Sequence, residues 1–290
     1  MGEVLHFDCL TDLTRCWRCR LYLMSQILII GAGAMGEAII AGLIKSGTNP
    51  TSISILEKRP ERSAQICSQY GVSELPNLEA LSGFAAIFLI VKPQDLATSV
   101  AEISDHISVE TVLISLAAGK KIAGIEAGLK GKSVPVIRVM PNTPALVGEG
   151  MAAISGGSHC SEKDLALAEK LLKGTGKVIR VEEDLQDAVT AVSGSGPAYF
   201  FLIIEAMVAA GIELGLTPED AHQLSVQTIY GAATMLRDSG KTPTTLRENV
   251  TSPNGTTAAA LKSLNESGLQ EIFSAALLAA RDRSRELAQG

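Results

Sequence analysis

A glycine-rich turn near the start of the chain is the clearest candidate for chemistry. The apolar run Ile27–Ile30 is followed directly by Gly31-Ala32-Gly33-Ala34-Met35-Gly36. In this spacing the first glycine permits a tight turn, the second lets backbone approach a pyrophosphate, and the third lets a helix pack on a strand. The following helix offers free N–H groups and a favourable dipole to an anion. We therefore predict that a dinucleotide is bound by Gly31, Gly33, Ala34, Met35 and Gly36.

The charged residues after the second apolar run bear on which dinucleotide is bound. Glu57 lies 21 residues after Gly36, where an acidic side chain can bind a ribose 2′-hydroxyl and favour NAD. Lys58 and Arg59 come next, and their cationic groups can bind the 2′-phosphate of NADP. The sequence carries both features; we expect NADPH to be preferred, and NADH stays open.

Two unusual loops occur in the second half of the chain. One is the Ser/Gly-rich segment Val192–Tyr199, and the other is Asn249–Thr257, which includes Ser-Pro-Asn-Gly-Thr-Thr just before a helical pattern. The second loop offers hydroxyl and backbone N–H groups without a strong base, a combination that suits a carboxylate. An ordinary helix cap is the alternative interpretation.

Short apolar runs alternate with helical patterns from Met24 to about Arg180. Strands are expected over 27–30, 53–56, 86–91, 112–116, 134–139 and 177–181, and helices over 36–46, 60–70, 95–103, 121–129 and 162–173. Continuous apolar strands with intervening helices imply a parallel sheet covered on both faces. Residues 24–183 are therefore predicted to form an α/β domain with a Rossmann-type doubly wound parallel sheet.

The strand patterns stop after Glu183, and the rest of the chain has helical patterns. Helices are expected over 184–191, 198–215, 217–237, 257–265 and 269–287. Residues 184–290 are therefore predicted to form an all-α domain that binds substrate and dimerises. Residues 1–23 differ in composition from both domains and are predicted to be a disordered leader.

The expected helix 198–215 is apolar nearly all round, with Glu205 and Glu213 as its only charged residues. A membrane span is the alternative, but the helix is short and Glu205 lies at its centre, where a charge is costly in lipid. A domain of this size cannot bury such a helix alone. We therefore expect a homodimer or higher homo-oligomer through the C-terminal helices, and no membrane partner.

Composition excludes several other classes of protein. The 290 residues carry a net charge of −6, and aromatic residues make up 4%, so a basic face or a base-stacking platform for nucleic acid is not expected. The five cysteines are an odd number, and three of them (Cys9, Cys16 and Cys19) lie in the leader. This distribution favours a reducing cytoplasm over a secreted disulfide framework.

The leader itself admits other interpretations. Cys16 and Cys19 offer a zinc or redox site, but a structural zinc needs about four ligands, and only Cys9 and His6 lie nearby as further candidates. A secretory signal over Leu21–Ile30 shows no convincing cleavage site. We expect a dispensable leader and no metal site.

Taken together, the motifs resemble pyrroline-5-carboxylate reductase over about Met24 to Leu287. Besides the glycine turn and the two loops, the matching pieces are Val91-Lys92-Pro93, Ala117-Ala118-Gly119, Arg138–Pro144 and Glu182-Glu183-Asp184. The resemblance implies reduction of 1-pyrroline-5-carboxylate to L-proline by NAD(P)H, the last step of proline biosynthesis.

The resemblance also implies which residues form the site. The dinucleotide side would include, besides the glycine turn, Asn77, Val91, Lys92, Pro93, Gln94, Ala117, Ala118, Gly119, Glu183 and Asn249. The substrate side would include Ser195, Ser252, Gly255, Thr256 and Thr257. The family usually has Ser-Pro-Gly-Gly where this chain has Asn254 at the first glycine. Asparagine tolerates positive φ, so we expect the loop geometry to survive.

No residue of the sequence can be assigned as the proton donor. Thr257 or a water is expected to orient the imine nitrogen, and Lys92, at the carboxyl end of a strand, is the other candidate catalytic residue. A β-hydroxyacid dehydrogenase is one alternative, but it needs a lysine in the helical half, and none occurs between Lys177 and Lys241. A non-catalytic dinucleotide-binding regulator is the other, but it has no need of the Ser-Pro-Asn-Gly-Thr-Thr loop.

Overall fold

The computed structural model describes residues 26–289, and it divides them into two units. The first unit runs to Gly194 and also includes the residues from Arg283 onward, whereas the second unit is Ser195–Asp282. The predicted leader, residues 1–23, lies outside the described residues. The predicted domain boundary at residue 183 falls ahead of this division and stays a prediction.

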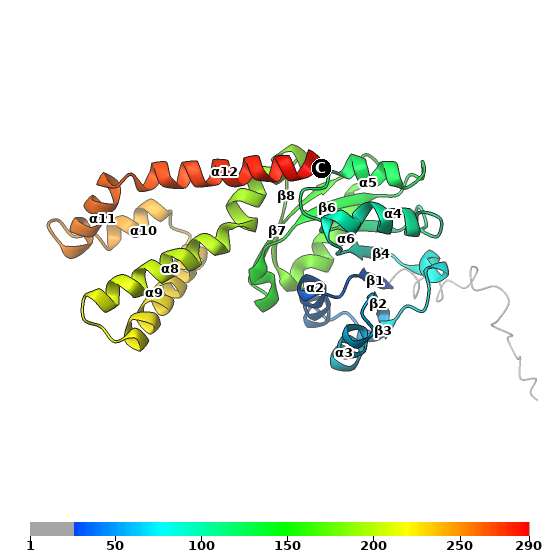
Figure 1. Cartoon of the computed structure of the whole chain (residues 1–290), viewed down its shortest axis with the longest axis horizontal. Helices are drawn as coiled ribbons and strands as arrows, with labels where there is room; N and C mark the ends of the chain where they lie inside the picture. The colour runs from blue at the N-terminus through cyan, green and yellow to red at the C-terminus, as the bar shows by residue number, and fades with distance from the viewer. Residues whose placement is uncertain (1–25, 290) are drawn as a thin grey trace, which may run out of the picture. The chain divides into compact units, whose positions relative to one another are not determined.

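An eight-stranded sheet with the order β3-β2-β1-β4-β5-β6-β7-β8 forms the centre of the first unit (Figure 1). Its strands are β1 (Ile27–Ile30), β2 (Ile53–Leu56), β3 (Ser73–Glu74), β4 (Ala86–Leu89), β5 (Val112–Ser115), β6 (Val136–Met140), β7 (Gly150–Gly156) and β8 (Gly176–Arg180). All neighbouring pairs are parallel except β6 and β7. The strand order reverses between β1 and β4, so a crevice is expected at the carboxyl ends of these two strands.

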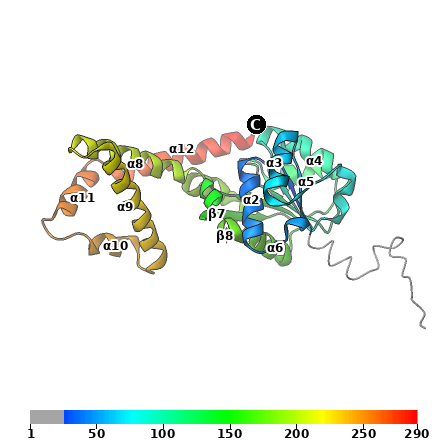
Figure 2. The ribbon, with the colours of Figure 1, turned by 90° about the horizontal axis from the view of Figure 1, so that it is seen from below.

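Helices cover both faces of the sheet (Figure 2). One face packs on α2 (Ala34–Lys45), α3 (Pro60–Tyr70) and α6 (Glu162–Leu172), and the other on α4 (Leu96–Ser104) and α5 (Ile122–Gly128). Successive residues of β1 point to opposite cores, with Ile29 in one and Leu28 in the other, and both are fully buried. Burial on both faces is why the strand is apolar at every position.

Strand β7 was not predicted, and from β7 onward the strands run opposite to the rest of the predicted parallel sheet. We expected no strand between residues 139 and 177, yet β7 pairs antiparallel with β6, with Ile137 opposite Gly156. It contains glycines and the small residues Ala152 and Ala153, which have low intrinsic preference for strands. Pairing with β6 on one side and β8 on the other stabilises this strand, and local sequence does not reveal it.

The second unit is helical. Its elements are α8 (Gly196–Glu213), α9 (Pro218–Asp238), α10 (Pro243–Asn249), α11 (Thr256–Glu266) and most of α12 (Leu269–Gln289). No helix was predicted between residues 237 and 257, so helix α10 was missed. Its start has the same features as that of α9: the Thr242 side chain accepts a hydrogen bond from the Thr245 N–H, and Pro243 occupies the first turn.

Helix α8 exposes large apolar side chains in the single chain. Phe200, Phe201 and Leu202 are each more than half exposed. By length and hydropathy the segment Glu183–Glu213 could span a membrane, and only 6% of its most apolar window is buried. An apolar helix with this exposure needs a covering surface.

Candidate active site

The three glycines of the turn after β1 differ in what surrounds them. Gly31 has φ +95, and a Cβ on it would lie 2.2 Å from the Ile90 carbonyl oxygen; a Cβ on Gly36 would lie 2.2 Å from the Gly31 oxygen. Gly33, by contrast, has φ −65 and no atom within 4 Å of its Cβ position. A side chain at Gly31 or Gly36 would therefore clash with the protein's own backbone, whereas a side chain at Gly33 would extend into open space.

That open space lies at the N-terminus of α2, a 12-residue helix. Gly33 is its N-cap and provides no side-chain hydrogen bond to the first turn. The N-terminal N–H groups and the helix dipole favour a bound anion, and Gly33 lets it approach the backbone closely. The turn thus fits the pyrophosphate of a dinucleotide, with Ala34 exposed and Met35 half-buried beside it.

Glu57, at the end of β2, is hydrogen-bonded to the turn itself. Its carboxylate accepts from the Ala32 N–H at 2.9 Å, from the Arg59 N–H at 3.1 Å and from Arg59 Nε at 3.0 Å. Burial alone would raise the pKa of Glu57, but the hydrogen bonds from Arg59 and Ala32 hold the pKa below its ordinary value. The Glu57 side chain is 8% exposed and that of Arg59 is 64% exposed, so Arg59 and the exposed Lys58 present cationic groups to solvent beside the turn.

A second set of contacts, which sequence reasoning missed, holds the other side of Ala32. Arg62 Nε donates to the Ala32 carbonyl at 2.8 Å and also pairs with Glu37 in the first turn of α2. The Tyr70 hydroxyl donates to the same Glu37 carboxylate at 2.9 Å. The hydrogen bond from Arg62 lowers the pKa of Glu37, so the carboxylate is ionised at neutral pH. The backbone N–H and the carbonyl of Ala32 are therefore both hydrogen-bonded. In the sequence, only the acidic residue Glu37, just after Gly36, could have indicated these contacts.

The other predicted first-unit residues follow β3, β4 and β5 at the same edge of the sheet. Val91–Gln94 follow β4, and Lys92 is exposed at the start of the short helical turn Pro93–Asp95. Ala117–Gly119 follow β5, with Ala118 exposed and Gly119 at φ +72. Asn77 follows β3, and its side chain accepts from the Glu79 N–H at 3.1 Å. Parallel strands bring all these segments to the carboxyl edge where α/β proteins bind ligands.

Glu183 is engaged by the protein itself. Its carboxylate accepts from the Ile122 N–H at 2.8 Å and from Arg138 Nη1 at 3.3 Å, and Arg138 is only 4% exposed. We predicted a cofactor contact for Glu183. That contact stays a prediction; in the structure, Glu183 Oε1 accepts from the N–H of the first residue of α5, the helix that follows Ala117–Gly119.

The second unit carries the remaining predicted residues. Asn254 has φ +59, as expected for the residue that replaces a glycine. Gly255 caps α11, and a Cβ on it would lie 2.3 Å from Ser252 Oγ, so the loop is tightly turned. Thr256 is exposed and Thr257 half-buried in the first turn of α11, a helix of 11 residues. Asn249 ends α10 and is exposed, and Ser195 is the half-buried N-cap of α8.

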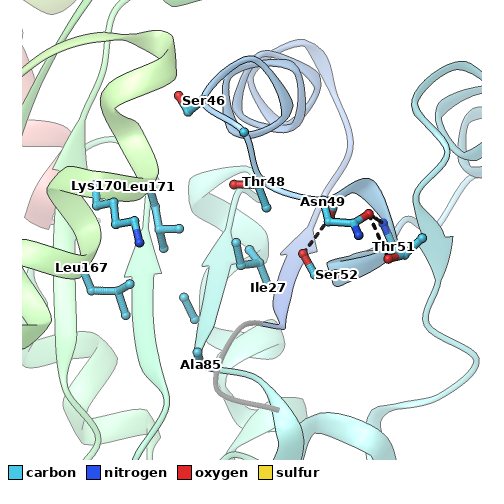
Figure 3. Close-up of a pocket in the computed structure, with 12 residues that line it drawn as sticks. Ile27, Ser46, Thr48, Asn49, Thr51, Ser52, Ala85, Leu167, Lys170 and Leu171 are labelled. Carbon is cyan, nitrogen blue, oxygen red and sulfur yellow. Dashed lines mark hydrogen bonds between the residues drawn. The ribbon is translucent and has the colours of Figure 1, made fainter. Parts of the chain in front are cut away.

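A cavity of about 540 Å³ lies elsewhere in the first unit (Figure 3). Ile27 and Ala85 line it at the amino-terminal ends of β1 and β4, together with Thr48, Asn49 and Lys170. This is the edge of the sheet opposite the glycine turn, so the cavity is not the expected ligand site. Within residues 26–289, no group of three or more His, Cys, Asp or Glu side chains is placed to hold a metal ion.

The fold and the glycine turn define a dinucleotide-binding protein with an additional helical unit. Two family models match the chain: "NADP oxidoreductase coenzyme F420-dependent" over residues 26–119, and "Pyrroline-5-carboxylate reductase dimerisation" over residues 183–287. The second match supports homo-oligomerisation. Contact with another subunit would explain the exposed apolar side chains of α8.

The full-length comparisons identify the family. Pyrroline-5-carboxylate reductase of Corynebacterium melassecola is 42% identical over 268 residues, covering 91% of this chain and 99% of the relative. The Arabidopsis thaliana enzyme is 38% identical, covering 91% and 96%. The solved reductase structure from Coxiella burnetii matches with a TM-score of 0.87 at 38% identity, covering 91% of this chain and 99% of that one. The Plasmodium falciparum enzyme, solved with NADP bound, matches with a TM-score of 0.78 at 27% identity, covering 91% and 98%. The chain belongs to the pyrroline-5-carboxylate reductase family, and this membership replaces the hydroxyacid dehydrogenase alternative.

Proposed function

We propose that this protein reduces 1-pyrroline-5-carboxylate to L-proline, the last step of proline biosynthesis, with NADPH as the preferred reductant. The observation that carries the proposal is a near-full-length likeness to reductases of this family, combined with a glycine turn whose middle glycine leaves room for a pyrophosphate. The two cysteines of the described residues, Cys67 and Cys160, are free, which supports a cytoplasmic location.

The reaction consumes one imine, one hydride and one proton. NADPH, held by the glycine turn Gly31–Gly36, would supply the hydride to the imine carbon; the C=N double bond would become a single bond, and the nitrogen would keep the proton of the iminium form. The protein's part is to hold the ring over the nicotinamide, because positioning can lower a barrier by about 7–11 kcal/mol.

The carboxylate of the substrate is assigned to the loop before α11. Ser252, Gly255, Thr256 and Thr257 supply hydroxyl and N–H groups at the start of an 11-residue helix, and the loop holds no basic residue. Ser195 is assigned to the substrate side, and Asn249 and Glu183 to the dinucleotide side. Thr257 or a water orients the nitrogen, and Lys92 contacts the dinucleotide from the loop after β4. In this proposal residues 24–183 bind the dinucleotide and residues 184–290 bind the substrate and dimerise.

The preference for NADPH rests on the residues at the end of β2. Glu57, the acid that would bind a ribose 2′-hydroxyl, already accepts hydrogen bonds from Ala32 and Arg59. Arg59 and Lys58 are exposed beside it and can bind a 2′-phosphate. Ion pairs between Lys58 or Arg59 and the 2′-phosphate, which NADH lacks, would make the protein bind NADPH more tightly than NADH.

Initial rates test the proposal. Purified protein is given 1-pyrroline-5-carboxylate with NADPH or NADH, and in parallel a 3-hydroxy acid with NADP⁺. We expect turnover of the imine with both reductants and a higher kcat/KM with NADPH. Oxidation of the hydroxy acid without imine reduction would refute the proposal.

A further inference from the structure

The loop Ala117–Lys121, between β5 and α5, is supported by the C-terminal end of α12. Gly119 in this loop is buried, and a Cβ on it would lie 3.5 Å from Leu287 Cβ and 3.6 Å from the Ala288 nitrogen. These α12 residues belong to the first unit, and the C-terminal end of α12 lies near the start of α5 (Figure 1). The end of α12 therefore packs against the backbone of a loop assigned to the dinucleotide.

The far end of the same loop is fixed by Glu183. The Glu183 carboxylate accepts from the N–H of Ile122, the first residue of α5, at 2.8 Å. Arg138, buried on β6, donates to the same carboxylate oxygen at 3.3 Å and orients it. A charge-assisted hydrogen bond of this kind is stronger than one between neutral groups.

Asp187 lies one helical turn after Glu183 and holds the end of α12. Its Oδ1 accepts from Ser284 Oγ at 2.7 Å, and Arg285 Nε lies 3.9 Å from its Oδ2. Ser284 is 5% exposed and the Asp187 side chain 16%, so this hydrogen bond is largely removed from water. The stretch from Glu183 to Asp187 thus fixes both the start of α5 and the segment of α12 that packs on Gly119.

We propose that Arg138, Glu183, Asp187 and Ser284 form a clasp that positions the Ala117–Lys121 loop for the dinucleotide. Asp187 and Ser284 are positioning residues, because they act on the loop through α12 without touching the ligand. The inference rests on the proposed function, in which this loop lines the NADPH site. It gives Glu183 a role in shaping the dinucleotide site through the protein's own backbone.

Three variants and one control test the clasp. Ser284→Ala and Asp187→Ala each remove the hydrogen bond, and we expect the Kd and KM for NADPH to rise about fivefold, with kcat at saturating NADPH little changed. Asp187→Asn keeps an acceptor oxygen for Ser284 Oγ and restores most of the affinity. The control Ser133→Ala alters an exposed serine in the turn before β6 and leaves both constants unchanged.

The readouts are the Kd of NADPH from its fluorescence on binding, the steady-state constants, and the melting temperature. If Ser284→Ala and Asp187→Ala lower the melting temperature while Kd and KM keep their wild-type values, the clasp is only structural and the inference is wrong. If Asp187→Asn binds NADPH as weakly as Asp187→Ala, the shared hydrogen bond is not what positions the loop. Failure of the wild-type protein to reduce the imine refutes the proposed function instead, and the fluorescence Kd still tests the clasp.

Discussion

Replacing Gly33 with alanine separates ligand binding from folding more cleanly than any other change in the glycine turn. Gly33 has φ −65, which alanine adopts readily, and nothing lies within 4 Å of the added Cβ. Fewer unfolded conformations stabilise the variant by about 0.4–1 kcal/mol. Alanine is a poorer N-cap than glycine by about 0.5 kcal/mol. The free energy of unfolding should therefore change by less than about 0.5 kcal/mol, a shift in melting temperature of about 2 °C at most.

Binding should respond very differently. The new methyl group would occupy the space through which a pyrophosphate reaches the N-terminus of α2. Losing one hydrogen bond to a charged group costs about 1.5–3 kcal/mol, so the Kd for NADPH should rise about ten- to hundredfold. Isothermal titration calorimetry gives the Kd, and thermal unfolding of the apoprotein gives the stability.

Gly36→Ala provides the matched contrast. Its Cβ would lie 2.2 Å from the Gly31 oxygen, so backbone must shift and the fold should lose about 1–3 kcal/mol. The reasoning is refuted if Gly33→Ala binds NADPH with wild-type affinity, or if it loses as much stability as Gly36→Ala.

Four further predictions concern the rest of the site. Thr257→Ala should raise the KM for 1-pyrroline-5-carboxylate about fivefold or more while leaving the Kd of NADPH unchanged; equal effects on both ligands would remove Thr257 from the carboxylate site. Arg59→Ala should raise the KM for NADPH about tenfold and leave that for NADH nearly unchanged, because only NADPH carries the 2′-phosphate; a uniform effect would contradict this. Asn254→Ala should lower the free energy of unfolding by about 1 kcal/mol in denaturant titrations, because φ +59 disfavours a Cβ, whereas Asn254→Gly should be close to neutral. The pKa of Glu57 lies below its ordinary value of 4.5, so its hold on the turn is present above that value and is lost as the pH falls through the lowered pKa; the Kd of NADH, which carries no titrating 2′-phosphate, should stay constant near neutral pH and rise only in acid, and a midpoint near neutral pH would contradict this.

Local sequence was sufficient for the elements whose burial leaves a pattern. The central strands β1, β4 and β5 lie between two helical layers, so each is a continuous apolar run that can be recognised without the fold. The bounds of α3 and of β1 were predicted to the residue, because Pro60 and Gly71 delimit the helix and Gly31 ends the strand.

Long-range pairing explains most of what was missed. Strand β7 depends on neighbours more than ten residues away, and its alanines and glycines give no local indication of a strand. The same holds at the site: the contacts of Arg62 with Ala32 and of Ser284 with Asp187 join residues 30 and 97 positions apart. The sequence indicated that the acidic side chains of Glu57 and Glu183 could contact a ligand. Only the structure showed that each carboxylate accepts a hydrogen bond from the protein's own backbone.

The most direct test of the central claim follows the hydride itself. NADPH carrying deuterium at one face or the other of nicotinamide C4 is supplied with 1-pyrroline-5-carboxylate, and the proline formed is analysed by mass spectrometry. The account predicts that one of the two labelled forms yields proline with a single deuterium at C5, in an amount equal to the NADPH consumed. NADPH consumption without labelled proline from either form would contradict the account.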